Sequence, residues 1–446
     1  MRIEGQSARR DGKPRWVSHQ FNLFPLVLCD DGSPWDEATV YILSRLENTL
    51  TPRMGTFSAI ADDLAAYRRF LDETGLDWTV FPLLKLRRPT YRFNGHLRFS
   101  IEAGEIAAST AKRRIGTVVA FYSWLRDEGV FTPENEPWIA SDRFIRFKDA
   151  KGFDQTKKVM TTDLAIAAPK QDDPYDGTIE DGGRLRPLPQ NEQQWLVEAL
   201  KKLDNPEMTL IHLFGLITGA RIQSVLTLRV RHVKLELQLD ESSEFRLPIG
   251  RSTGVDTKND KQMVLNLPVW FYNKLRTYAL SERATGRRLR ASDGDNDEQY
   301  LFMSARGAPL YESKREAQEF NALNTLRHSK SGQAVRQFIK DRLIPCIRTT
   351  HSAATFHFQF HDLRATFGMN LTDWQLELVA SGKTTLHQAR EFVKARMGHD
   401  SAATTDRYLQ YRQNLQFIRA ARGEYENRLK ELANTATRYL DARDAK

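Results

Sequence analysis

The sequence predicts a mainly α-helical protein with a small antiparallel sheet. Apolar residues recur at three- and four-residue steps over 56–74 and over 109–128, which is the period of a helix with one buried face. Between 243 and 268 apolar and polar residues alternate instead, which is typical of short strands. A late stretch over 412–440 carries another helical stripe, which we expect Gly423 to interrupt.

The composition is that of a globular protein with a polyanionic partner. Of 446 residues, 40% are apolar and 28% charged, and 66 Lys and Arg against 57 Asp and Glu give a formal charge of +9. This balance favours nucleic acid as the partner. The two cysteines, Cys29 and Cys346, are too few for a disulfide scaffold or a cysteine-based zinc module. Without a secretory signal or an apolar run long enough to span a membrane, we expect a cytoplasmic protein with no membrane partner.

Four segments are predicted along the chain. Residues 1–50 form an N-terminal extension of unknown role, and residues 51–148 form a small helical domain. Residues 149–186 are rich in Lys, Asp, Gly and Pro and show little periodicity, which predicts a linker. Residues 187–446 form a second domain with a helical C-terminal tail.

Two amphipathic helices make up the first domain. The helix over 56–74 stops at Gly75, and its stripe consists of Phe57, Ile60, Leu64, Tyr67 and Leu71. The helix over 109–128 has Ser109 as its expected N-cap and Gly129 after its end. Its other side carries a basic cluster: Lys112, Arg113 and Arg114. This cluster is either a solvated face or a set of phosphate contacts.

The second domain begins with helices and continues with a hairpin region. Helices are predicted over 189–203, 207–216 and 221–228. Two or three short strands follow over 243–268, and a further helix starts at Val269. The small sheet of the predicted fold class lies in this hairpin region.

Three short motifs of the second domain hold residues suited to binding an oxyanion. Arg221 stands at a helix start after a glycine turn, where N–H groups and a guanidinium can hold a phosphate. In HDLRATFG, His361 and Arg364 are three residues apart and share a helix face. In GHDSAATTDRY, His399 precedes Tyr408, with a turn and a new helix between them. Taken singly, each residue also fits an ordinary surface or core position.

The order Arg, His-x-x-Arg, Gly-His-x8-Tyr resembles the tyrosine recombinase family, also called the phage integrase family. The resemblance covers 187–412 with these motifs. It covers 55–135 more loosely, as the helical core-binding domain that such proteins place before the catalytic domain. The family also has a lysine on a strand turn between the first arginine and the His-x-x-Arg motif. Lys258 resembles that lysine, and Lys261 is its close rival.

The sequence departs from the family at two positions. Many members carry an acid three residues after the first arginine, where this chain has Ser224. Many have an aspartate before the apolar residue that closes the next turn, where His232 precedes Val233. Those acids usually support the arginine, so the departures put its supporting contacts in doubt rather than the reaction.

The resemblance implies a site-specific DNA recombinase, such as the integrase of a mobile element. It implies a catalytic set that should converge on one basic pocket: Arg221, Lys258, His361, Arg364, His399 and Tyr408. The arginines would hold the scissile phosphate, and Tyr408 would attack it to form a 3′-phosphotyrosyl link. Lys258 would protonate the departing 5′ oxygen, His361 would move the tyrosine proton, and His399 would hydrogen-bond the phosphate. No cofactor, ATP or metal is implied.

The implied partners are double-stranded DNA and further copies of the chain. A homotetramer would exchange strands between two DNA sites, and the stretch over 412–440 would dock on a neighbouring protomer. The protein would be associated with the nucleoid. Lys112, Arg113 and Arg114 would contact DNA phosphates. The target sequence, the direction of the reaction, the role of residues 1–50 and any accessory DNA-bending or directionality factor stay open.

Three other functions compete with this one. A type IB topoisomerase would relax DNA with the same kind of tyrosine, and a catalytically silent relative would bind DNA without cutting it. A metalloenzyme is the third, because His357 and His361 lie four residues apart. The run HFQFH lacks the glutamate of a zinc-protease helix, and its alternating aromatic residues predict a strand that aims the two histidines differently.

Overall fold

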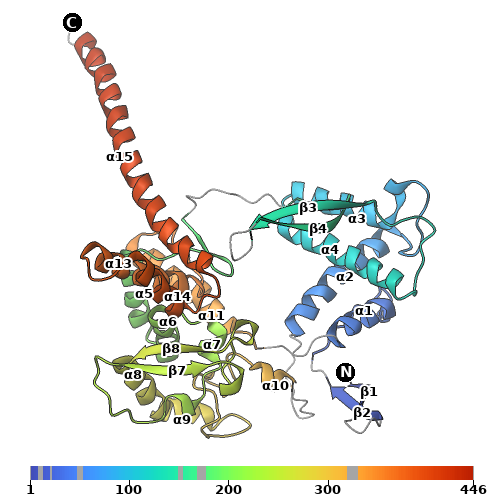
Figure 1. Ribbon diagram of the computed structural model, residues 1–446, viewed down its shortest axis with the longest axis horizontal. Coiled ribbons are helices and arrows are strands. Elements are labelled where there is room, and N and C mark those ends of the chain that lie inside the picture. Colours follow the sequence, from blue (N-terminus) through green and yellow to red (C-terminus); the bar gives the residue numbers. More distant parts are fainter. Residues whose placement is uncertain are drawn as a thin grey trace. The chain divides into compact units, whose positions relative to one another are not determined.

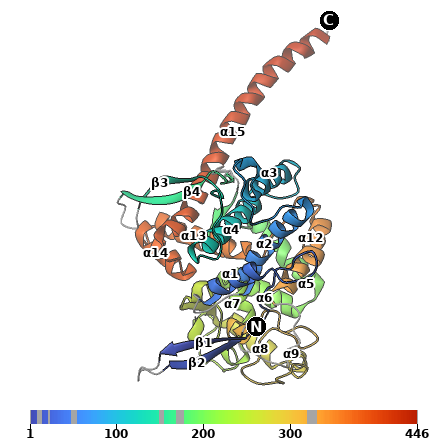
Figure 2. The same cartoon turned by 90° about the vertical axis from the view of Figure 1, so that its right-hand side faces the viewer.

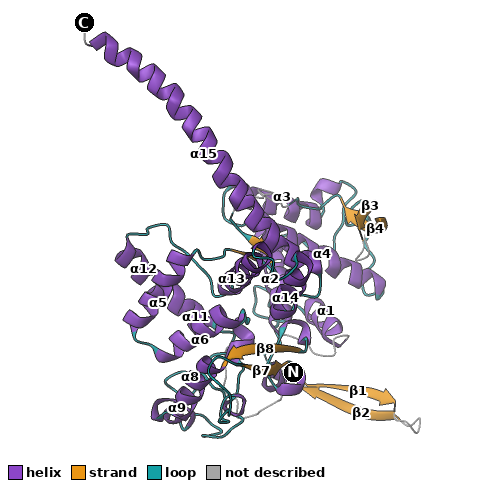
Figure 3. Cartoon of the chain, turned by 60° about the vertical axis from the view of Figure 1, so that its left-hand side comes forward, coloured by secondary structure: helices purple, strands orange, loops and turns teal. Residues whose placement is uncertain are grey.

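The protein forms two compact units, Met1–Asp172 with Ala317–His328 and Asp173–Glu316 with Ser329–Lys446. The computed structural model describes residues 2–8, 14–20, 23–47, 54–148, 154–167, 177–318 and 330–444. These residues are mainly helical, and their strands pair as two-stranded antiparallel hairpins (Figure 3), which confirms the predicted fold class. In the same ranges, no helix is both long and apolar enough to cross a membrane.

Helices with a shared aromatic core build the first unit. Its elements are α1 (Asp36–Glu47), α2 (Met54–Thr74), α3 (Pro89–Glu102) and α4 (Ala108–Asp127), with the hairpins β1 (Arg2–Ala8)–β2 (Pro14–Gln20) and β3 (Ala140–Lys148)–β4 (Asp154–Thr162). Helices α1, α2 and α4 lie side by side (Figures 1 and 2). Tyr41 of α1 packs edge-on against Phe121 of α4. The buried hydroxyls of Tyr67 on α2 and Tyr122 on α4 share a 2.8 Å hydrogen bond.

Both helices predicted for this unit are present. Gly75 follows α2 and Gly129 follows α4, each with a positive φ that favours glycine after a helix end. The prediction for Ser109 is wrong, because the helix starts one residue before it, at Ala108. Ala107 is the N-cap in extended conformation, and no side chain caps this helix.

The boundaries of the two units differ from those of the predicted segments. Residues 23–47 of the expected extension belong to the first unit, because Trp35 and Ile42 are buried in its core. The expected linker over 149–186 contains β4 and a further short hairpin. Two parts of that segment lie outside the described residues: 149–153 and 168–176. Short, polar strands lack the hydrophobic period that would have revealed them.

The second unit is mainly helical and contains two small hairpins. In chain order it contains β5 (Ile179–Glu180), β6 (Arg184–Leu185), α5 (Gln190–Leu203), α6 (Pro206–Thr218), α7 (Ile222–Leu226), β7 (Glu244–Ile249), β8 (Met263–Pro268), α8 (Val269–Leu280), α9 (Glu282–Arg288), most of α10 (Lys314–Gln318), α11 (Gln333–Phe338), a π-helical turn (Ile339–Leu343), α12 (Ile344–His351), α13 (Asp362–Ala380), α14 (Leu386–Met397) and α15 (Ala402–Asp444). Helix α13 packs on both α6 and α14, and α15 projects away from the other helices of this unit (Figure 1).

The predicted elements of this unit are present, with two differences. Helices α5, α6, α7 and α8 and the antiparallel pair β7–β8 lie where the sequence predicts them. Helix α15 runs unbroken through Gly423, because one glycine costs a helix only about 1 kcal/mol. The aromatic run is no strand: Phe356, Phe358 and Phe360 are buried on one side of an unpaired segment before α13.

Candidate active site

The buried guanidinium of Arg364 ties together three parts of the second unit. Its Nη1 donates to the Gly219 carbonyl after α6 (3.1 Å), and its Nη2 donates to the Met397 carbonyl at the end of α14 (2.8 Å). Its Nε donates to Oδ2 of Asp181 (2.8 Å), in the turn between β5 and β6. Helix α13 carries Arg364 in its first turn, and only 3% of the residue is exposed. The orientation of this guanidinium is therefore fixed by the fold.

Four of the predicted residues converge on the Asp181 carboxylate. Besides Arg364, the Tyr408 hydroxyl (3.0 Å) and Nε2 of His399 (3.2 Å) donate to Oδ2. Nη2 of Arg221 lies 3.8 Å from Oδ1. We call the position enclosed by these four side chains the anion seat. An ionised carboxylate only accepts hydrogen bonds, which assigns the donor role to His399 and Tyr408.

Tyr408 reaches the anion seat from the first turns of α15. Its ring is fully buried beside Ile179, Met369, Val393 and Met397. The centre of the His399 ring lies 5.7 Å from that of Tyr408. Nδ1 of this imidazole bonds with Oγ1 of Thr405, also on α15, at 2.9 Å. The turn predicted at Gly398 and the new helix predicted after it are both present, and they place the imidazole and the phenol on one carboxylate oxygen.

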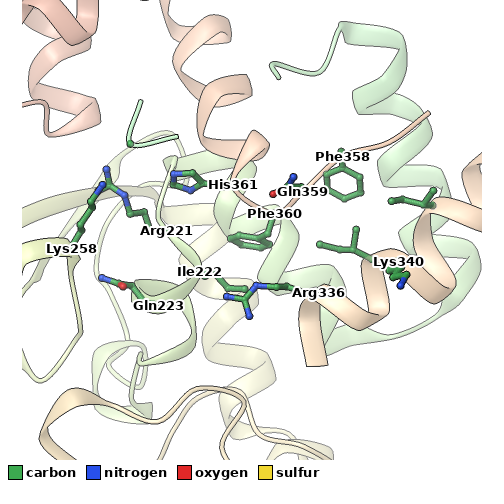
Figure 4. A pocket seen from close by; sticks show the side chains of 13 residues that line it. Arg221, Ile222, Gln223, Lys258, Arg336, Lys340, Phe358, Gln359, Phe360 and His361 are labelled. Carbon is green, nitrogen blue, oxygen red and sulfur yellow. The ribbon is translucent and has the colours of Figure 1, made fainter. Parts of the chain in front are cut away.

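Arg221, Lys258 and His361 line a cavity of about 450 Å³ next to the anion seat. Arg221 is the N-cap residue of α7, two residues after the left-handed turn at Gly219, as the sequence predicts. The heads of Arg221 and Lys258 approach each other, and the His361 imidazole lies nearby (Figure 4). A Cβ added to Gly182 in the β5–β6 turn would lie 2.8 Å from Nζ of Lys258 and 3.8 Å from Nη2 of Arg221.

The rival lysine, Lys261, does not line this cavity. Its Nζ donates to the Gly398 carbonyl (2.8 Å) and forms an ion pair with Asp400. Lys261 therefore braces the turn that carries His399, whereas Lys258 faces the cavity.

The two residues that depart from the family pattern make supporting contacts. Ser224 on α7 donates to the Asp256 carbonyl (2.7 Å), which ties α7 to the turn that holds Lys258. Nδ1 of His232 accepts from the Arg229 backbone (2.8 Å), and its Nε2 bonds with the Thr253 carbonyl (3.2 Å). At the two positions where the family often has an acid, neutral side chains thus make structural hydrogen bonds.

Charge and burial set the protonation of the site. Although burial favours the neutral acid, the hydrogen bond from His399 and the charge of Arg364 hold the pKa of Asp181 far below its ordinary range. Burial, together with the negative charge of Asp181, raises the pKa of Tyr408 well above its ordinary value. Burial and the charges of Arg221 and Arg364 lower the pKa of His361 to about 4. Near neutral pH the site holds a carboxylate, a phenol and a neutral His361.

The predicted basic cluster lies in the first unit, on α4. Nη1 of Arg113 forms a 2.8 Å ion pair with the buried carboxylate of Asp63 on α2. Lys112 is exposed, and Arg114 is half-buried. Of the three, Arg113 makes a contact that holds two helices together.

No group of three or more His, Cys, Asp or Glu side chains is placed to hold a metal ion in the described part of the chain. His357 lies in the loop before α13 and is exposed, whereas His361 lines the cavity next to the anion seat.

Asp181 is the residue of the site that the sequence patterns missed. Its segment was predicted to be a linker, and the only local signal is an Asp-Gly pair, which is common in tight hairpin turns. That signal predicts a turn but says nothing about which distant side chains the carboxylate meets. Chemically, the arrangement binds one buried oxyanion with two guanidinium groups, an imidazole and a phenol.

No family model matches the chain, and no curated protein matches it. The solved structures that are similar to it include three protein–DNA complexes. XerH site-specific recombinase bound to palindromic difH substrate is 14% identical over 86% of this chain and 88% of that chain, with a TM-score of 0.49. A lambda integrase (75–356) dimer bound to a COC′ core site is 15% identical over 83% and 94%, with a TM-score of 0.44. The Tn1549 transposon integrase with a circular intermediate DNA is 15% identical over 83% and 94%, with a TM-score of 0.45.

Proposed function

We propose that this chain is a tyrosine recombinase, a site-specific enzyme of a mobile element that breaks and rejoins DNA. The observation that carries the proposal is the convergence of Arg221, Arg364, His399 and Tyr408 on one buried carboxylate. Attack on a phosphodiester requires neutralised oxygens beside a nucleophile, and these groups supply both. In the proposal, the scissile phosphate takes the anion seat.

In the proposed reaction, the Tyr408 oxygen attacks the scissile phosphorus. A 3′-phosphotyrosyl ester forms and the bond to the 5′ oxygen breaks. Lys258 gives a proton to that oxygen, and His361 takes the proton of the phenol. Arg221 and Arg364 neutralise the non-bridging oxygens. Attack by the 5′-hydroxyl of another strand reverses each step, and because the ester retains the energy of the broken bond, joining needs no ATP.

The protonation of His361 supports this division of roles. With a pKa of about 4, the imidazole is neutral near pH 7 and able to accept a proton. A phosphate in the anion seat would replace the negative charge of Asp181, so an anion that stabilises the imidazolium would remain beside His361.

The wider assembly belongs to the same proposal. The first unit, which includes the helical domain over 51–148, would bind double-stranded DNA with Lys112 and Arg114. The second unit would form a homotetramer with its copies on two DNA sites. The exposed apolar residues Tyr425, Leu429 and Leu432 of α15 are candidates for that contact.

An adduct assay tests the proposal. Suicide duplexes are made from the ends of the element that carries the gene and are nicked beside each candidate cleavage position. They are incubated with protein in EDTA and resolved on a denaturing gel. We expect the wild type to give a covalent protein–DNA band that Tyr408→Phe lacks. Tyr411→Phe, one helical turn further along α15, is the matched control and should retain the band.

Each other result points to a different function. An adduct that persists in Tyr408→Phe would place the nucleophile elsewhere, and Tyr411 would be tested next. Binding without an adduct at any end would favour a catalytically silent DNA-binding protein. Relaxation of supercoiled DNA that carries no target site would favour a type IB topoisomerase.

A further inference from the structure

The anion seat is already filled by the protein's own chain. Asp181 lies in the tight turn between β5 and β6, where its backbone N–H donates to the Gly183 carbonyl (3.0 Å). Only 4% of the residue is exposed. Its Oδ2 takes the hydrogen bonds of Arg364, His399 and Tyr408. These are the groups that the proposed reaction directs at the phosphate.

A carboxylate and a phosphodiester cannot occupy this seat together. Both are anions, and both would need the Nε–H of Arg364 and the Nε2–H of His399 as donors. Like charges at contact distance in a buried, weakly polar site repel each other strongly. A DNA phosphate can therefore reach these donors only after the Asp181 carboxylate has left.

Asp181 also keeps the proposed nucleophile inactive. The Tyr408 hydroxyl donates its hydrogen bond to Asp181. Burial raises the pKa of the phenol, and the negative charge of this carboxylate raises it further. A protonated phenol is a weak nucleophile. Departure of the carboxylate would free the oxygen and remove one of the two causes of the raised pKa.

The hairpin is small enough to move while the core stays folded. β5 and β6 pair through Ile179↔Leu185 and Glu180↔Arg184. Ile179 is the buried anchor of β5, in the small apolar cluster around Tyr408. Beyond β6 the chain is fastened to α13, since the backbone N–H of Arg186 donates to Asp362 (2.9 Å). On the other side, the turn is held by the burial of Ile179, by Arg407, which donates to the Glu180 carbonyl (2.6 Å), and by the contacts of Asp181, so these are the contacts that its displacement would break.

We propose that the β5–β6 hairpin is an autoinhibitory plug, whose Asp181 carboxylate occupies the phosphate seat until DNA displaces it. The proposal rests on the proposed function, because it takes the seat to be that of the scissile phosphate. In the free protein the plug holds Arg364, His399 and Tyr408 in position and prevents attack by the Tyr408 hydroxyl. When DNA binds, the incoming phosphate accepts hydrogen bonds from the same donors.

A role as the proton acceptor of Tyr408 fits Asp181 less well. In the anion seat, Asp181 would exclude the phosphate that the tyrosine has to attack, so it cannot take the proton of the phenol during that attack.

Binding of inorganic phosphate tests the plug without DNA. The affinity of the full-length protein is measured by titration calorimetry at constant ionic strength, for wild type and Asp181→Asn. We expect Asp181→Asn to bind phosphate at least about tenfold more tightly, because the amide has the shape of the carboxylate without its charge. Glu180→Gln, which removes the same charge from the exposed neighbour, should bind as the wild type does. Equal or weaker binding by Asp181→Asn overturns the proposal.

Adduct formation gives a second measurement. In single turnover on a suicide duplex, Asp181→Asn should form the covalent product faster than the wild type and Glu180→Gln. A slower rate in a folded Asp181→Asn protein would mean that Asp181 takes part in the reaction, and would overturn the plug. If no protein forms an adduct, the proposed function fails and the phosphate titration alone decides the plug.

A second variant covers the case in which Asp181→Asn fails to fold. Ile179→Ala keeps the carboxylate but removes the buried apolar side chain of β5. It should also bind phosphate more tightly than the wild type, because the plug is held less firmly. Thermal unfolding confirms that the protein is folded, and unchanged phosphate affinity in a folded Ile179→Ala protein counts against the plug.

Discussion

At the scale of single residues, the site depends on how closely α13 approaches the Tyr408 ring. A Cβ added to Gly368 on α13 would lie 2.4 Å from Cε1 of Tyr408 and 2.9 Å from Cε of Met397. Real Cβ atoms do not approach ring carbons this closely, so only glycine fits. This glycine is required for space, since its φ is not positive.

Gly368→Ala should therefore destabilise the protein and misplace the tyrosine. Overpacking of this kind costs about 1–3 kcal/mol, to be measured by urea unfolding. The adduct rate should fall with it. Gly116→Ala, in α4 with nothing within 4 Å of the added Cβ, is the control and should instead gain about 0.5–1 kcal/mol. Stabilisation at both positions would contradict the packing argument.

The two lysines of the β7–β8 turn should separate in a chemical rescue. Without its general acid, Lys258→Ala should cleave about 10²–10⁴-fold more slowly. A substrate with sulfur at the 5′ bridging position should restore the rate, because a thiolate leaves without being protonated. Lys261→Ala loses structural contacts to Gly398 and Asp400 and keeps the general acid, so the sulfur substrate should not restore its rate. Rescue of Lys261→Ala alone would make Lys261 the acid.

At the scale of elements, the basic side of α4 combines two different roles. Arg113 spans to α2, where Asp63 is almost fully buried and Thr117 donates to the same carboxylate oxygen (2.9 Å). Lys112 points into solvent. A charge cluster in the sequence thus divides into a structural cation and an exposed one.

This division predicts that two neighbouring substitutions change different properties of the protein. Arg113→Ala leaves a buried carboxylate without its cation and should lower the free energy of unfolding by about 1–3 kcal/mol. Lys112→Ala should leave stability unchanged and reduce the slope of log affinity for DNA against log salt by about 0.9, the value of one phosphate contact. Equal slopes for wild type and Lys112→Ala would remove Lys112 from the DNA contacts.

At the scale of the whole molecule, each unit has an apolar core of its own, and the second unit also contains the fully buried His212 and the half-buried His361. Burial lowers the pKa of His212 to about 4, and burial with two arginine charges does the same for His361. Both values lie below the ordinary 6.5. As the pH falls, the unfolded chain therefore binds these protons first.

The stability that the two neutral histidines contribute is complete above about pH 6.5 and is lost as the pH falls toward 4. The melting temperature of the wild type should fall across this window. His212→Gln combined with His361→Gln should give a shallower fall, whatever its starting value. Identical slopes in wild type and double variant would show that other groups cause the acid sensitivity.

The sequence by itself determined what is local. Helical periods marked α2, α4, α5 and α6, and alternation marked the β7–β8 hairpin, because burial of one face leaves its period in the chain. The motifs singled out Arg221, Arg364, His399 and Tyr408, and the resemblance to the tyrosine recombinase family implied that they converge. The spacing within a motif is enough only for local statements, such as that His361 and Arg364 share a helix face.

Only the tertiary structure decided what lies between those residues. Asp181 meets Arg364 across 183 positions of sequence and Tyr408 across 227. No local period records such a contact, and a polar turn within a predicted linker gives no sign of the partners that it meets. The space needed at Gly368 and the ion pair of Arg113 likewise depend on how two elements pack. Sequence patterns identified the donors of the anion seat, and packing alone placed the protein's own carboxylate among them.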